Sequence, residues 1–331
     1  MQAPSASDTQ VILGSGGAIG RALAPALAAY AATVRCVSRS PHGLPTGDST
    51  TAYVHHPADL LAPAAVAEAV RGASVAYLTA GLAYDTAVWR RDWPRLVDNV
   101  VAACAKTGAR LVFFDNVYAY AASSYRHMTE SAPLDPPSAK GAVRAAVLER
   151  LWRAHAAAEV EVCVARAADF YGPGIANSLL LELVIKRLAA GKAAQWLRGN
   201  GAGAPLPSPD VPHSFTYTPD AGRHLALLGN DDRAYGESWH LPTAPAPWTP
   251  REWVARAADL LGVPAKLQVL PRWLWRGLAL VNADLRELYD VRQQVAGPYV
   301  FDSGKFEGVF GAGATPYAEG LRAVVAAEAA A

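Results

Sequence analysis

Residues 10–20 read QVILGSGGAIG, and this stretch decides the fold of the chain. Its apolar start predicts a buried strand, and the alanine-rich residues that follow predict a helix. Between them, Gly14 permits a tight turn, Gly17 lets a ligand approach the backbone, and Gly20 lets helix and strand pack closely. Because a helix N-terminus offers N–H groups to phosphates, this order predicts a dinucleotide diphosphate rather than an ordinary glycine-rich turn. The predicted contacts are Gly14, Ser15, Gly17, Ala18, Ile19 and Gly20.

Outward from this stretch, short apolar segments alternate with alanine-rich helical segments up to about residue 170. Strands are predicted at residues 11–14, 33–37, 52–54, 75–79, 110–114 and 160–165, and helices at 18–30, 64–70, 89–107 and 140–156. Short continuous apolar strands between helices are typical of a parallel sheet covered on both faces. Right-handed crossovers then favour an α/β fold with a doubly wound parallel sheet, the Rossmann arrangement.

After residue 170 the composition shifts toward glycine, proline and tryptophan, although helical stretches recur at about 178–190, 220–228, 249–261 and 316–330. The segment TPRE, residues 249–252, predicts a helix that begins with a capping box. We expect residues 1–170, with a returning segment 213–243, to form the cofactor-binding domain. Residues 171–212 and 244–331 are expected to form a smaller, discontinuous substrate lobe.

The composition limits the classes of partner. The 331 residues are 52% hydrophobic and carry a formal net charge of +1, which indicates a globular protein without a basic surface for nucleic acid. No apolar segment reaches the roughly 18 residues that cross a bilayer, so no membrane association is expected. The three cysteines, Cys36, Cys104 and Cys163, lie in apolar runs, which fits a reduced cytoplasm. We expect small-molecule partners, and a homodimer through two exposed helices is plausible.

The end of the second predicted strand bears on the choice of cofactor. A carboxylate at this place holds an unphosphorylated ribose, whereas the chain has Ser38, Arg39 and Ser40. A guanidinium and two hydroxyls suit a 2′-phosphate, which a carboxylate would repel. The sequence therefore predicts NADP in preference to NAD, with Arg39 as a solvated surface charge as the alternative.

Further motifs resemble the extended short-chain dehydrogenase/reductases, the NAD(P)-dependent epimerase/dehydratase group. Residues 165–174, ARAADFYGPG, resemble the family segment beside the nicotinamide, and residues 213–228 resemble the family's return to the cofactor domain. By this resemblance, Asp59 and Leu60 meet the adenine, residues 78–81 border the cofactor, and Asn99 lies in the long helix beside it. The further cofactor residues implied are Asp59, Leu60, Thr79, Ala80, Gly81 and Asn99.

Typical members of that family use a serine or threonine, then a tyrosine four residues before a lysine. The lysine holds the nicotinamide ribose and lowers the pKa of the phenol, which passes a proton while hydride moves. Here Asn116 takes the serine position, Pro136 stands at the tyrosine position, and Lys140 remains. Pro137 also keeps Pro136 out of helical geometry. The resemblance implies that Lys140 fixes the ribose and that Asn116 holds a substrate or nicotinamide group.

The missing tyrosine leaves three hypotheses. The first is an NADP-dependent reductase of a small, largely apolar carbonyl or enone, in which Tyr118 replaces the proton donor. Tyr84 and Tyr171 would then line the substrate pocket, although each tyrosine could equally be a packing residue. Enone reductases related to progesterone 5β-reductase also lack the usual pair. The alternatives are a nucleotide-sugar epimerase or dehydratase and a non-catalytic NADP(H) sensor.

A metal site is not expected. His55, His56 and Asp59 lie close together in sequence, but neighbouring side chains on an extended segment point to opposite faces. Their positions therefore do not predict a shared metal ion.

Overall fold

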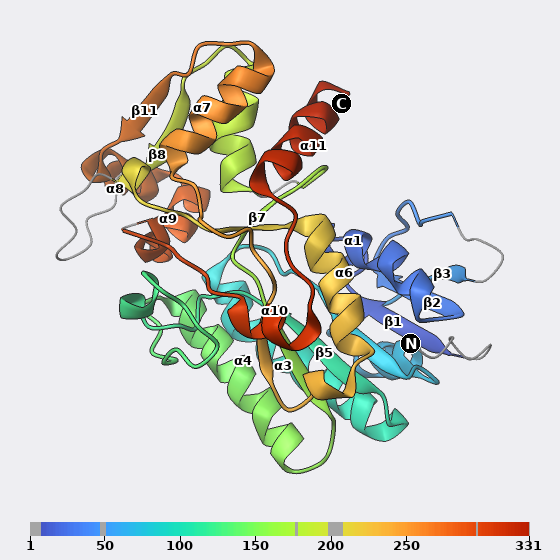
Figure 1. Ribbon diagram of the computed structural model, residues 1–331. Helices are drawn as coiled ribbons and strands as arrows, with labels where there is room; N and C mark the ends of the chain where they lie inside the picture. Colours follow the sequence, from blue (N-terminus) through green and yellow to red (C-terminus); the bar gives the residue numbers. More distant parts are fainter. Residues whose placement is uncertain (1–7, 47–50, 176–177, 198–207, 296, 331) are drawn as a thin grey trace. The chain divides into compact units, whose positions relative to one another are not determined.

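The computed structural model describes residues 8–46, 51–175, 178–197, 208–295 and 297–330 (Figure 1). The chain divides into two compact units. Unit 1 comprises Met1–Asp115, Val143–Arg166 and Pro219–Leu241, and unit 2 comprises Asn116–Ala142, Ala167–Thr218 and Pro242–Ala331.

Unit 1 is built around one seven-stranded sheet with the order β3-β2-β1-β4-β5-β6-β10. Every pair of neighbouring strands is parallel. This arrangement confirms the predicted doubly wound α/β fold. The strands are β1 (Thr9–Leu13), β2 (Thr33–Ser38), β3 (Ala52–Pro57), β4 (Val75–Leu78), β5 (Arg110–Asp115), β6 (Val162–Arg166) and β10 (Ser238–His240).

The sheet reverses its winding direction at β1. The chain runs from β1 outward to β2 and β3, then crosses back to place β4 on the other side of β1. In sheets of this kind, ligands bind beyond the carboxyl ends of the strands at such a reversal. Gly14 follows β1 directly, so the glycine-rich stretch begins at this place.

Helices cover both faces of this sheet (Figure 1). On one face, α1 (Ala18–Ala26) lies against α6 (Thr218–Gly229), where a Cβ on Gly222 would come within 2.4 Å of the Ala22 backbone. The other face carries α2 (Pro63–Val70), α3 (Thr86–Thr107) and α4 (Ala139–Ala156). Arg150 of α4 pairs with Asp98 of α3 at 3.1 Å. The four helices predicted in this region are confirmed, with shifted ends.

The start of α3 is one of these shifts, since it was predicted at residue 89. The helix begins at Thr86 because the Asp85 carboxylate accepts the Val88 N–H at 2.8 Å and caps the first turn. Pro94 lies inside the helix without ending it. The predicted start was therefore too late, since the N-cap signal at Asp85 was overlooked.

Unit 2 contains two small parallel strand pairs and several helices. The pairs join β7 (Asp169–Tyr171) to β9 (Phe215–Tyr217) and β8 (Ala194–Leu197) to β11 (Leu267–Leu270). The predicted capping box is confirmed, because Thr249 and Glu252 exchange hydrogen bonds at the start of α7 (Pro250–Leu261). The other helices of eight or more residues are α8 (Arg272–Val281), α9 (Ala283–Asp290) and α11 (Tyr317–Ala329).

Residues 116–142 belong to unit 2, whereas the sequence analysis assigned them to the cofactor domain. The physical reason is a set of backbone bonds with the segment 299–302. The Met128 N–H donates to the Val300 oxygen at 2.8 Å, and the Val300 N–H donates to the Tyr125 oxygen at 2.8 Å. Apolar side chains bury this junction, with the members Val117, Tyr120, Tyr125, Met128, Ala168, Tyr299 and Phe301.

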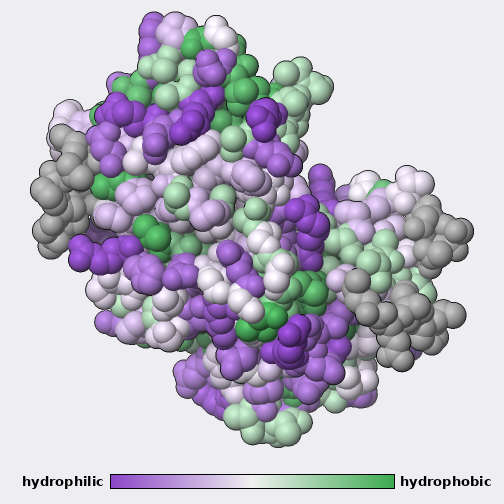
Figure 2. All heavy atoms as spheres, viewed as in Figure 1, coloured by the Kyte–Doolittle hydropathy of each residue, from purple (hydrophilic) through white to green (hydrophobic). Residues whose placement is uncertain are grey.

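The surface shows hydrophilic residues interspersed with small hydrophobic areas on the face drawn in Figure 2. None of the helices in the described ranges is both long and apolar enough to span a membrane.

Candidate functional site

The glycine-rich loop after β1 has the close contacts that its sequence predicts. Gly14 has a φ of +104°, and a Cβ there would lie 2.4 Å from the Ala80 Cα atom. A Cβ on Gly20 would lie 2.6 Å from the Gly14 oxygen. A side chain fits at neither position, so the turn, the helix start and the segment after β4 pack together only because both residues are glycine.

Gly17 differs from these two glycines. It is the N-cap of α1, it is exposed, and a Cβ there would make only an ordinary contact at 3.6 Å. No side chain caps this helix. Among the described residues, the first N–H groups of α1 therefore have no side-chain acceptor, and a diphosphate is a group that such N–H groups bind.

Several of the remaining predicted cofactor residues support the loop from behind. The Ser15 hydroxyl is buried and donates to the Val37 oxygen at 3.0 Å, so it ties the loop to β2. The hydroxyl of Thr79 lies 3.4 Å from the oxygens of Leu13 and Gly14. Ile19 is buried, Ala18 and Ala80 are half-buried, and Gly81 is exposed.

The predicted adenine segment after β3 is ordered by local bonds. The Asn99 amide donates to the Leu60 oxygen at 3.0 Å, and the exposed Asp59 carboxylate accepts the Leu61 N–H at 3.0 Å. Leu60 is buried. Asn99 therefore positions this segment, and a direct role of Asp59 toward an adenine stays a prediction.

At the end of β2, Arg39 and Ser40 are exposed while Ser38 is part of a hydrogen-bonded cluster. The Ser38 hydroxyl donates to the Ser40 oxygen at 2.7 Å. It also lies 3.1 Å from His42 Nδ1 and 3.0 Å from His55 Nε2. Sequence analysis considered His55 only as a metal ligand and missed its pairing with Ser38. Within the described ranges, no three His, Cys, Asp or Glu residues are grouped to hold a metal ion.

The turn after β5 carries two of the predicted catalytic residues. The Asn116 side-chain oxygen accepts the Tyr118 N–H at 3.0 Å, which closes a tight turn. The half-buried Tyr118 ring packs against the apolar cluster that contains Val117 and Phe301. A Cβ on Gly141 would lie 2.2 Å from the Tyr118 oxygen, so this turn abuts the start of α4.

Lys140 is fully buried in the first turn of α4 and faces α9. Its ammonium group pairs with the Glu287 carboxylate and donates to the Glu287 main-chain oxygen at 3.2 Å. Glu287 is only 15% exposed at its side chain. The predicted ribose role of Lys140 stays a prediction, and it requires that Glu287 share or release the ammonium.

Asp290, one turn further along α9, caps α4 from outside. Its carboxylate oxygens accept the N–H groups of Ala139 at 3.2 Å and of Lys140 at 3.1 Å. Ser138 adds a local cap, since its hydroxyl oxygen accepts the Gly141 N–H at 3.0 Å. The helix begins at Ala139, after Pro136 and Pro137, so the place of the family's tyrosine lies before the helix.

Asp115, the last residue of β5, is buried between two arginines. Its oxygens accept from Arg144 Nε at 2.8 Å and from Arg166 Nε at 3.1 Å. The Arg144 guanidinium also lies 4.4 Å from the centre of the Trp93 ring. This charged group joins Arg144 of α4 to the end of β5 and the end of β6 within unit 1.

A second pairing in unit 2 joins Asp169 to His213. His213 is buried, its Nε2 lies 2.8 Å from the Asp169 carboxylate, and its ring stacks on Tyr299 with centroids 4.3 Å apart. Burial, followed by the nearby Asp169 carboxylate, holds the pKa of the Tyr299 phenol well above its usual range. Burial and the neighbouring Tyr118 raise the pKa of Tyr125 likewise.

The two tyrosines assigned to a substrate pocket differ in their surroundings. Tyr171 is buried among aromatic rings, with Trp253 at 5.3 Å and Tyr317 at 5.8 Å between centroids. This is the packing role that the sequence left open. Tyr84 is 40% exposed and contacts Trp89 edge to face.

A family profile accounts for this set of features. The profile of the NAD dependent epimerase/dehydratase family matches residues 10–204, more than half of the chain. The chain belongs to this family. A comparison with curated protein sequences gave no significant match. The match to this family profile confirms the family resemblance that was predicted from the sequence.

Solved structures share the fold at low sequence identity. The dTDP-glucose 4,6-dehydratase DesIV from Streptomyces venezuelae matches with a TM-score of 0.76, 19% identity and 97% of each chain covered. The UDP-glucose 4-epimerase of Thermus thermophilus matches with a TM-score of 0.75, 18% identity, and 98% of this chain and 99% of that one. The UDP-N-acetylglucosamine 4-epimerase from Bacillus cereus matches with a TM-score of 0.73, 13% identity, and 97% and 96% covered. The first two structures were solved with NAD.

Sequence reasoning missed Glu287, Asp290, Asp169 and His213. Asp169 and His213 lie in the segments 165–174 and 213–228, ARAADFYGPG and HSFTYTPDAGRHLALL, on which the family resemblance is based. Both residues could therefore have been noticed as polar side chains in those segments. Glu287 and Asp290 lie in a segment that was not predicted to be helical, although their spacing of three puts them on one face of a helix. That spacing is the only sequence signal for them.

Proposed function

We propose that this chain is an enzyme that binds a nicotinamide dinucleotide in unit 1 and modifies a sugar carried on a nucleotide. The observation that carries the proposal is the loop of residues 14–20, where two glycines admit no side chain and the exposed Gly17 opens the start of α1. This loop follows β1 at the point where the sheet reverses its winding. When bound, the dinucleotide supplies a reversible hydride acceptor at its nicotinamide ring.

Residues of the chain would have separate tasks. The N–H groups of Ala18 and Ile19 would bind the diphosphate, and Ser38, Arg39 and Ser40 would meet the adenosine ribose. Arg39 supports NADP in preference to NAD, since none of these three side chains is acidic. Lys140 would hold the nicotinamide ribose, and Tyr118 would accept or return the proton of a substrate hydroxyl.

Two considerations favour a nucleotide sugar over an apolar enone as the substrate. The family is one of NAD-dependent epimerases and dehydratases, and the structural neighbours named above are named as enzymes of dTDP-glucose, UDP-glucose and UDP-N-acetylglucosamine. In unit 2, the polar side chains of Asn116, Asp169 and His213 lie in the segments after β5, in β7 and before β9, where they are held by bonds within the protein.

One observation keeps the NADP-dependent reductase as a second candidate. Tyr118 packs against apolar side chains that include Val117, Met128 and Phe301, which suits an apolar carbonyl or enone. A reductase would consume NADPH stoichiometrically, whereas an epimerase or 4,6-dehydratase would recycle its cofactor.

The test uses the full chain. NAD and NADP are titrated by calorimetry, and UDP- and dTDP-sugars are then incubated with catalytic amounts of the bound cofactor while products are followed by proton NMR. Sugar conversion without net cofactor consumption is the expected result. NADPH consumption with carbonyls, enones or imines, and none with sugars, would favour the reductase. Cofactor binding without turnover of either class would contradict both and favour a sensor.

A further inference from the structure

Two large hydrophobic side chains of α8 lie in solvent. Trp273 is 74% exposed and Leu280 is 78% exposed, whereas no other large hydrophobic residue in the described ranges exceeds 48%. Their spacing places them on the same face of the helix, with the exposed Gly277 between them. Single exposed hydrophobic residues are ordinary on protein surfaces, but these two form a patch. We call Trp273, Gly277 and Leu280 the outer strip of α8.

The inner face of α8 packs within unit 2. The buried Trp275 meets the Tyr289 ring of α9 edge to face, with centroids 5.2 Å apart, and α8 lies beside α9 (Figure 1). Ala279, one turn further along α8, is also buried. Because Trp275 and Ala279 hold the helix in place, the packing of α8 does not depend on its outer strip.

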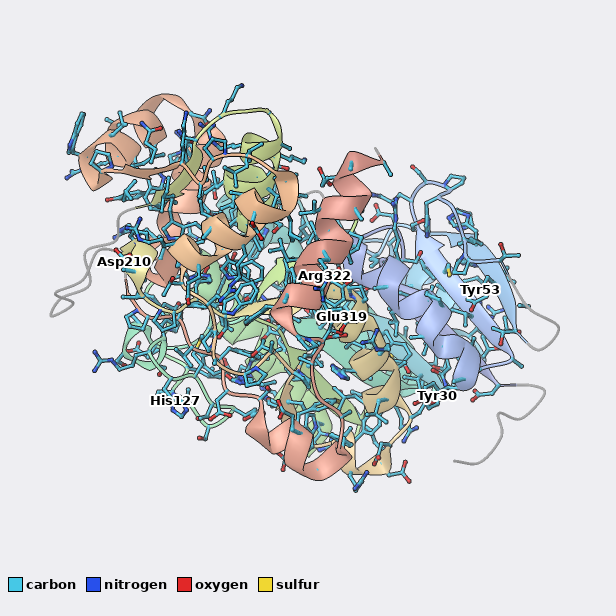
Figure 3. All side chains as sticks on the ribbon, turned by 45° about the horizontal axis from the view of Figure 1, so that its top comes forward. Tyr30, Tyr53, His127, Asp210, Glu319 and Arg322 are labelled. Atoms are coloured by element: carbon cyan, nitrogen blue, oxygen red, sulfur yellow. The ribbon has the colours of Figure 1, made fainter. Side chains whose placement is uncertain are left out.

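The exposed charges near the outer strip are positive. Arg276 is exposed about 60° around the helix from Trp273, and Arg286 of α9 and Lys266 before β11 are exposed as well. None of these three side chains forms an ion pair with a residue that the structure describes. The exposed Arg251 of α7 differs from them, because it pairs at 2.5 Å with Asp210, which is labelled in Figure 3.

The acidic residues at the end of α9 do not cancel this charge. Glu287 pairs with the buried Lys140, and the Asp290 carboxylate accepts the first N–H groups of α4. Between residues 266 and 286 the sequence has four basic residues and one acidic residue, namely Lys266, Arg272, Arg276 and Arg286 against Asp284. The pair α8 and α9 therefore combines an exposed apolar strip with a net positive charge.

This combination selects among possible partners. A second copy of the chain would bring two positively charged surfaces together, which is unfavourable. One tryptophan and one leucine from each copy would also bury much less than the about 1,200 Å² that a stable interface needs. A membrane with anionic lipids attracts basic side chains and takes up tryptophan and leucine at its interface. Arginine can cover apolar surface with its stem while its guanidinium stays at the headgroups.

We propose that the outer strip of α8, with Arg276 beside it, docks the chain onto a membrane surface that contains anionic lipids. Trp273 and Leu280 insert at the interface, and the exposed basic residues bind the lipid phosphates. The sequence predicted no membrane association because no segment is long enough to cross a bilayer, but a helix that lies in the interface needs no such length. The inference goes beyond the proposed sugar-nucleotide function and does not depend on it.

Vesicle sedimentation of the full chain tests this proposal. Vesicles of phosphatidylglycerol and phosphatidylcholine in equal amounts should bind the chain, and vesicles of phosphatidylcholine alone should not. Binding should weaken as the salt concentration rises from about 0.1 M to about 0.5 M. W273A and L280A should each weaken binding about tenfold, and R276Q about fivefold. Because all three side chains are exposed, the melting temperature of each variant should equal that of the wild type.

Two matched variants separate the outer strip from the surface in general. L260A removes an exposed leucine of α7, and R251Q removes an exposed arginine of the same helix. Both should bind vesicles as the wild type does. Equal losses in R251Q and R276Q, or in L260A and L280A, would overturn the proposal, because binding would then follow total charge or total apolar surface.

Other occupants of the outer strip give different results. A dimer that dissociates in W273A and L280A, with no vesicle binding by the wild type, would assign the strip to a second copy and overturn the membrane proposal. Binding to poly-glutamate but not to anionic vesicles would assign it to an acidic protein, with the same consequence. Absence of any binding to anionic vesicles is sufficient to reject the proposal. None of these results concerns cofactor binding or sugar turnover, so the proposed function is tested separately.

Discussion

The Lys140 ammonium lies in the interior of unit 2 and is bonded to Glu287, through both its carboxylate and its main-chain oxygen, the latter at 3.2 Å. The lysine that the sequence assigns to a nicotinamide ribose thus has a carboxylate partner from α9. Since the lysine side chain is 0% exposed, its charge depends on this partner.

Replacing Glu287 with glutamine should destabilise the chain strongly. The change removes the carboxylate that pairs with the buried Lys140 ammonium, and breaking a comparable buried pair costs about 3 to 5 kcal/mol. K140M should lower the free energy of unfolding by less than E287Q does, because the Glu287 carboxylate that it leaves behind is partly exposed. The double variant should be more stable than the sum of the single changes predicts, as measured by urea unfolding. Additive losses would show that the two side chains are not energetically coupled.

Replacing the glycines of residues 14–20 with alanine should affect stability differently at each position. G20A should destabilise the chain by about 1 to 3 kcal/mol, since its methyl group would overlap the Gly14 oxygen. G14A adds backbone strain at a φ of +104° to an overlap with Ala80. G17A has room for its methyl group and should leave the melting temperature nearly unchanged while weakening cofactor binding. Equal destabilisation by G17A and G20A would contradict this division.

Removal of the external cap on α4 is expected to have a moderate effect. D290A leaves the Ala139 and Lys140 N–H groups without their acceptor and should cost about 1 to 2 kcal/mol of unfolding free energy. D290N, which keeps a side-chain acceptor, should recover most of that loss. The exposed Asp259 gives a matched control, since D259A should lie within about 0.5 kcal/mol of the wild type.

The buried thiols should make the chain less stable in alkaline solution. Burial raises the pKa of Cys36 to about 11 and that of Cys104 to about 12. Because the folded values lie above the unfolded value near 8.5, the folded chain holds these protons longer. The contribution of these thiols to the free energy of unfolding should therefore be constant below about pH 8 and decline from about pH 8.5 to about pH 11. Alkylation at mild alkaline pH should modify the thiols only after unfolding, and rapid native labelling would contradict their burial.

The proton-transfer assignment is tested by Y118F. Loss of the hydroxyl should lower turnover by about 100-fold or more while the cofactor dissociation constant stays unchanged. The ring and its packing on the apolar cluster are retained in this variant. Unchanged turnover in Y118F, together with loss of turnover in K140M, would keep the lysine assignment and remove Tyr118 as the proton donor.

The sequence by itself determined the features that depend on neighbouring residues. The three glycines, the alternation of strands and helices, and the capping box of Thr249 and Glu252 are local patterns, and each is present in the structure. Residues a few positions apart interact in the same way wherever the segment lies. The fold class and the position of the glycine-rich loop could therefore be predicted.

Only the tertiary structure decided the surroundings of the candidate catalytic and ribose-binding side chains. Glu287 and Asp290 are 147 and 150 positions from Lys140, His213 is 44 positions from Asp169, and His55 is 17 positions from Ser38. No periodicity connects such residues, because their contact depends on how whole helices and strands pack. A charge or a hydrogen-bond donor is present in the sequence, but its partner is set by the fold, and that partner decides whether the group is available for chemistry.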